Sequence, residues 1–106
     1  MKLIKQISND IAENISEAKD KIRTAYELKA ESPEAAAWYR EMAQAHIGFN
    51  GKGHEVIKKL IEAYKASEDY KRNPAFADGM LGAWNAIHDD LIAKTAEVKA
   101  MVDGFK

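Results

Sequence analysis

Histidines and carboxylates are the residues of this chain with the clearest capacity for chemistry. The sequence contains no cysteine, which excludes disulfides, thiolate catalysis and metal sites with cysteine ligands. Its three histidines are His46, His54 and His88, and 17 acidic side chains are spread along the chain. A metal ion would therefore be held by imidazole and carboxylate groups, a ligand set that suits iron, manganese or zinc.

His46 and His54 stand at the two ends of a glycine-rich segment, HIGFNGKGHE. If this segment is helical, the two histidines lie about 12 Å apart along the helix axis. Two histidines that chelate one ion from a single helix need a spacing of three or four residues instead. A metal site at either histidine therefore requires carboxylates from another helix.

Carboxylates of this kind are present near the N-terminus. If the chain folds back at residues 31 and 32, Glu17 comes level with His46, and Glu13 comes level with Asn50. The sequence therefore predicts five candidate metal ligands: Glu13, Glu17, His46, His54 and His88.

A structural interpretation of the same residues competes with the metal site. The acidic residues between Asp10 and Glu31 recur at heptad spacing, as they do on a solvated helix face. In this interpretation His46 and His88 are neutral core histidines, each hydrogen-bonded to a neighbouring helix.

The position of His88 argues against a single site built from three histidines. If the chain folds back a second time at residues 71–76, His88 lies opposite position 59. Its level along the bundle then differs from that of His54 by roughly 7 Å and from that of His46 by roughly 20 Å.

The elements that position these residues are predicted to be helices. Apolar side chains recur at steps of three and four, and the two prolines, Pro33 and Pro74, stand where helices begin. The expected helices cover about residues 2–30, 33–70 and 76–103. We therefore predict an all-α fold, an antiparallel bundle of three long helices in a single domain over residues 1–106.

The glycine-rich segment decides whether the second helix is continuous. An apolar seam runs through it without a change of phase: Tyr39, Met42, His46, Phe49, Gly53, Val56, Leu60 and Ala63. We therefore predict a continuous helix, in which Gly48, Gly51 and Gly53 mark a close approach to another helix or a kink. The alternative is a turn at residues 48–53, which would divide the chain into four helices.

Composition limits the kinds of partner. The net charge is -1, and basic and acidic side chains alternate, so nothing attracts nucleic acid or an anionic membrane. No signal peptide or membrane-spanning run of apolar residues is recognisable, which predicts a cytoplasmic protein. The aromatic side chains exceed what a slender bundle hides, and this surplus favours a homodimer.

Three segments, WYREMA, GHEVIKKLI and IHDDLIAKTAEVK, together with the order of the helices, resemble small ferritin-like helical-bundle proteins of phage and prophage genomes. That resemblance implies a ferritin-like bundle and, for a phage protein, a location in the host cytoplasm. Ferritin-like proteins hold two metal ions with carboxylates and Glu-x-x-His motifs. The corresponding stretch here reads His46-Ile47-Gly48-Phe49, so the motif is eroded.

The function expected from these observations is protein association without enzymatic activity, as a homodimer or with another protein partner. In this interpretation no cofactor is required. The alternative is a ferritin-like metal-binding protein that uses the histidines and carboxylates named above for iron, manganese or zinc. A third candidate is a carrier for an apolar ligand in a gap beside Gly48, Gly51 and Gly53.

Overall fold

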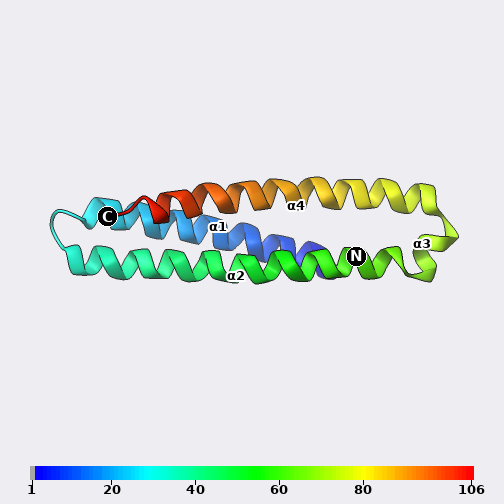
Figure 1. Cartoon of the computed structure of the whole chain (residues 1–106), viewed down its shortest axis with the longest axis horizontal. Helices are drawn as coiled ribbons and strands as arrows, with labels where there is room; N and C mark the ends of the chain where they lie inside the picture. Colours follow the sequence, from blue (N-terminus) through cyan, green and yellow to red (C-terminus); the bar gives the residue numbers. More distant parts are fainter. Residues whose placement is uncertain (1) are drawn as a thin grey trace.

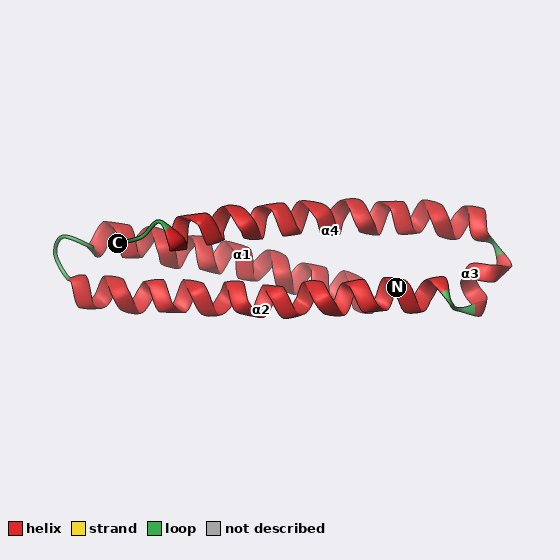
Figure 2. Cartoon of the chain, in the orientation of Figure 1, coloured by secondary structure: helices red, strands yellow, loops and turns green. Residues whose placement is uncertain are grey.

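The computed structural model describes residues 2–106, and every regular element in this range is a helix. The elements are α1 (Lys2–Leu28), α2 (Pro33–Lys65), α3 (Glu68–Arg72) and α4 (Pro74–Asp103). The chain reverses direction between α1 and α2 and again between α2 and α4, so the long helices lie side by side with α3 at one end (Figure 1). Only short loops join the helices (Figure 2). The prediction of an all-α fold is confirmed.

The second predicted helix is too long, because the chain leaves α2 after Lys65 instead of continuing to residue 70. The side chain of Ser67 fixes this break. Its Oγ donates a hydrogen bond to the carbonyl oxygen of Tyr64 at 2.6 Å and accepts one from the backbone N–H of Tyr70 at 3.4 Å. Serine at this position caps the short helix α3, as it does at many helix N-termini.

Helix α2 passes through residues 48–53 without interruption, and none of its glycines has a positive φ. The turn at residues 48–53 is therefore absent. Of its three glycines, Gly53 lies at a close approach, since a Cβ there would stand 3.0 Å from Cγ1 and Cδ1 of Ile11. Gly48 and Gly51 face open space, so they mark neither a helix contact nor a break.

The core consists of two apolar clusters at different levels of the bundle. The first contains Ala18, Ile22, Ala25, Ala36, Ala43, Val98 and Val102. The second contains Ile4, Ile11, Ile57, Ile61, Leu81 and Leu91. Both draw on all three long helices, so burial of apolar surface in each cluster holds α1, α2 and α4 together. Between the clusters, α2 and α4 contribute polar side chains to the interior.

The molecule is a rod of 61 × 17 × 16 Å. Among residues 2–106, no helix has both the length and the apolar character that crossing a membrane requires.

Candidate functional site

A polar layer is made by Asn50 and His54 of α2 and by His88 and Thr95 of α4. Along the helices, Asn50, His54 and Thr95 stand between the two clusters, and His88 stands between Leu81 and Leu91 of the second cluster. Asn50 is fully buried, and its Nδ2 donates to the carbonyl oxygen of Ile11 at 3.3 Å and, more weakly, to Oγ1 of Thr95 at 3.5 Å. Its Oδ1 has no hydrogen-bond partner among residues 2–106. A buried acceptor without a partner costs free energy.

The hydrogen bonds of the Thr95 hydroxyl determine which ring nitrogen of His54 carries the proton. The Thr95 hydroxyl donates its one proton to the carbonyl oxygen of Leu91 at 2.8 Å. It can therefore only accept at its contact with Nε2 of His54, at 3.3 Å, and that ring nitrogen must carry a proton. In neutral His54 the lone pair consequently lies on Nδ1.

The lone pair of His54 faces the second histidine of the layer. Nδ1 of His54 and Nε2 of His88 are 3.1 Å apart, and the ring centroids are 5.0 Å apart with an interplanar angle of 45°. Because Nδ1 of His54 accepts, Nε2 of His88 is the donor in the neutral pair. The two imidazoles thus form a direct nitrogen-to-nitrogen contact between α2 and α4.

The surroundings favour the neutral form of both rings. Burial lowers the pKa of His54, and the nearby His88 lowers this pKa further. Burial also lowers the pKa of His88, although the negative charge of Asp89 opposes this shift. Both pKa values are lowered, so the neutral form of each imidazole is favoured at pH 7.

The expected offset between His54 and His88 is wrong. The prediction placed the second reversal of the chain at residues 71–76, whereas α2 ends at Lys65 and α4 begins at Pro74. The midpoint of the reversal therefore lies at a lower residue number than predicted. As a result, His88 comes level with His54 instead of residue 59.

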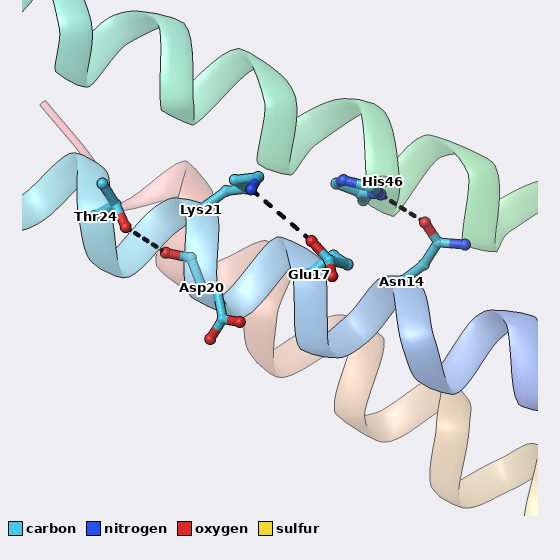
Figure 3. A network of polar contacts seen from close by, with 6 residues as sticks. All are labelled: Asn14, Glu17, Asp20, Lys21, Thr24 and His46. Atoms are coloured by element: carbon cyan, nitrogen blue, oxygen red, sulfur yellow. Dashed lines mark hydrogen bonds and ion pairs between the residues drawn. The ribbon is translucent and has the colours of Figure 1, made fainter.

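The first reversal shows a similar shift around His46. Helix α1 ends at Leu28 instead of residue 30. As a result, the imidazole of His46 contacts Asn14 and not Glu17, and Nδ1 of His46 lies 2.5 Å from Oδ1 of Asn14 (Figure 3). Glu17 instead faces Lys21 on its own helix, with Nζ and Oε2 3.8 Å apart (Figure 3). Glu13 is exposed.

The five predicted ligands therefore do not converge. Within residues 2–106, no group of three or more histidine and carboxylate side chains is arranged to hold a metal ion. The structure brings together His54 and His88, and it separates this pair from His46, Glu13 and Glu17. Asn14, Asn50 and Thr95, which sequence reasoning did not assign to a site, complete the polar contacts. In the sequence, these three residues differ from other polar residues only in that they stand on or beside a helical seam of apolar residues.

A second feature is an apolar groove between α1 and α2 on the outside of the bundle. It has a volume of about 200 Å³. Its lining residues are Ile7 and Asp10 from α1 and Phe49, Lys52, Gly53 and Val56 from α2. Gly53 lets Ile11 approach α2 at the same level. The groove thus combines exposed apolar side chains with one acidic and one basic residue.

In comparisons with known proteins, no family model matches this chain, and no curated protein or solved structure matches it significantly. The resemblance to ferritin-like phage proteins stays a prediction.

Proposed function

We propose that this protein acts by association, without enzymatic activity, and that its first partner is a second copy of the same chain. The groove between α1 and α2 carries the proposal. Its two largest apolar residues on α2, Phe49 and Val56, are 54% and 43% exposed. Because they are seven residues apart, they lie on the same face of the helix.

The exposed face of α2 continues beyond the groove. Trp38, which is 57% exposed, precedes Phe49 by eleven residues, and Met42 and Ala45 lie between them at helical spacing. Helix α2 therefore has two apolar stripes, an inner one in the core and an outer one on the surface. A contiguous apolar stripe on a small protein is typical of an interaction surface.

The charges of the groove suit pairing with an identical surface. Asp10 and Lys52 line the groove from α1 and α2. A two-fold symmetric contact is reciprocal: if one residue contacts a different residue of the partner, the same pair forms a second time with the two copies exchanged. When α1 of one copy lies over α2 of the other, Asp10 of each copy faces Lys52 of its partner, and the contact contains two ion pairs around an apolar centre.

The test is the mass of the protein in solution, measured by light scattering at micromolar concentration. We expect twice the mass of one 11.8 kDa chain. Phe49→Glu places a charge in the proposed contact and should give monomers. Phe76→Glu is the matched control, since Phe76 is 67% exposed near the start of α4 and away from the groove, and it should leave the dimer intact.

Charge reversal tests the orientation of the pair. Asp10→Lys alone should weaken the dimer, and addition of Lys52→Asp should restore it, because both ion pairs reform with exchanged signs. A native protein that is monomeric at these concentrations contradicts the proposal. So does a dimer that Phe76→Glu dissociates and Phe49→Glu does not.

This proposal retains three expectations from the sequence: a ferritin-like bundle, a phage-type origin and a cytoplasmic location. The all-helical fold and the reversal of direction between successive long helices support the first.

A further inference from the structure

We propose that His54 and His88 bind one divalent ion of a late transition metal, with Zn²⁺, Ni²⁺ and Cu²⁺ as the class of ligand. The ion would be held between Nδ1 of His54 on α2 and Nε2 of His88 on α4. This site goes beyond protein association and does not depend on it.

The separation of the two nitrogens carries the proposal. Zinc binds histidine nitrogen at about 2.0–2.1 Å, so two nitrogens of a tetrahedral ion lie roughly 3.3 Å apart. The two imidazole nitrogens here are 3.1 Å apart. The separation of these atoms therefore has to change by only a few tenths of an ångström, while both rings turn so that their lone pairs converge on an ion beside the line that joins the two nitrogens.

The contact between His54 and Thr95 prepares one ligand. The Nε2–H group of His54 donates to the Thr95 hydroxyl, which in turn donates to the carbonyl oxygen of Leu91. A hydrogen bond from the far ring nitrogen is the usual support of a metal-bound histidine, because it fixes the tautomer and the orientation of the ring. Nδ1 of His54 thus presents its lone pair to the site in advance.

The second ligand needs one change of protonation. In the neutral pair, Nε2 of His88 donates to Nδ1 of His54. When the ion binds, this proton leaves Nε2 and a proton is taken up at Nδ1 of the same ring, so the imidazole stays neutral and its other tautomer coordinates. The partial exposure of His54 leaves solvent access for this exchange and for the ion.

The donor atoms select the class of metal. Two imidazole nitrogens favour Zn²⁺, Ni²⁺ and Cu²⁺ over Mg²⁺ and Ca²⁺, which prefer oxygen ligands. The negative charge of Asp89 acts on His88 and favours a cation there. Water would complete the coordination sphere. Oδ1 of buried Asn50, which has no partner among residues 2–106, leaves an acceptor in the same polar layer.

This site differs from the carboxylate-rich site that the sequence predicted. Glu13, Glu17 and His46 are not part of it. Its two protein ligands come from different helices, so a bound ion would join α2 to α4 and stabilise the folded chain.

Calorimetric titration of chelator-treated protein with Zn²⁺ and Ni²⁺ tests the site. We expect one ion per chain, with affinity reduced roughly tenfold or more by either His54→Gln or His88→Gln. The matched control is His46→Gln, which removes the third histidine and should leave the affinity unchanged. Circular dichroism establishes that each variant is folded before it is titrated.

Nitrogen-15 NMR of the histidine side chains in native protein provides a test that needs no substitution. Zn²⁺ should shift Nδ1 of His54 and Nε2 of His88 and leave both nitrogens of His46 in place. The proposal is overturned by the absence of binding at millimolar metal, by unchanged signals from His54 and His88 when Zn²⁺ binds, or by an equal loss of affinity in the His46→Gln control.

Discussion

At the scale of single residues, three glycines of one sequence segment have different environments. A Cβ at Gly53 would meet the side chain of Ile11, whereas a Cβ at Gly48 or Gly51 would meet nothing within 4 Å. All three are in helix α2, where glycine is less favourable than alanine. Gly53 therefore allows helix packing, while the other two reduce helix stability without a packing benefit.

Alanine substitution should separate these roles. Gly48→Ala and Gly51→Ala should each raise the free energy of unfolding by about 0.5–1 kcal/mol, because alanine has the higher helix propensity. At Gly53 the added methyl group meets the fully buried Ile11, and overpacking of about 1–3 kcal/mol should cancel or exceed that gain. Urea unfolding measures all three. If Gly53→Ala stabilises the protein as much as Gly48→Ala and Gly51→Ala do, Ile11 does not approach Gly53 closely enough to exclude a methyl group.

At the scale of elements, helix α4 is attached to α2 through polar as well as apolar contacts. The apolar clusters lie at two levels of the bundle, and the His54–His88 contact joins the helices at the level of the second cluster. Arg40 adds another polar link, because its Nε donates to the carbonyl oxygen of Val102 at 3.3 Å near the end of α4. We therefore expect the α2–α4 interface to respond to the protonation of its histidines.

The stability of this interface should depend on pH. The pKa of both His54 and His88 is lowered from 6.5 by burial. Well above pH 6.5 the histidines are neutral in the folded and unfolded chains, and their contribution to stability is complete. As the pH falls below 6.5, the unfolded chain binds protons first, so the free energy of unfolding decreases until the folded pair is protonated too.

Urea unfolding in buffer with a chelator, at pH values from about 7.5 to about 5, measures this dependence. The double variant His54→Gln, His88→Gln should lose less stability over this range than the native chain. If the double variant is as acid-sensitive as the native protein, other groups are responsible.

At the scale of the whole molecule, the elongated shape limits how much apolar surface one chain can bury. The radius of gyration of the Cα atoms is 17.3 Å, while a compact domain of this length has a value of about 13 Å. A rod has more surface for its volume than a compact domain. Large apolar side chains such as Trp38, Phe49 and Phe76 accordingly remain exposed.

Small-angle scattering should distinguish two ways of pairing such rods. Contact through the groove between α1 and α2 places the molecules side by side, so the longest dimension should stay near the 61 Å of one chain. The monomeric Phe49→Glu variant should have the same length with a smaller cross-section. A native dimer with nearly twice this length would be an end-to-end pair, and would contradict association through the groove.

The sequence by itself determined the helical character of this protein. The recurrence of isoleucines such as Ile11 and Ile22 at helical spacing and the positions of Pro33 and Pro74 depend on local backbone geometry. For this reason the starts of α2 and α4 lie at or close to the predicted positions. Continuity of the apolar seam through the glycines also predicted that α2 is unbroken.

The tertiary structure alone decided which polar residues meet. Helix ends at Leu28 and Lys65, a few residues before their predicted positions, shift the register of the paired helices by about one helical turn. This shift replaces Glu17 by Asn14 opposite His46 and brings His88 to His54. Side-chain contacts between helices depend on axial level and rotation together, and neither is encoded by the spacing of residues within a single helix.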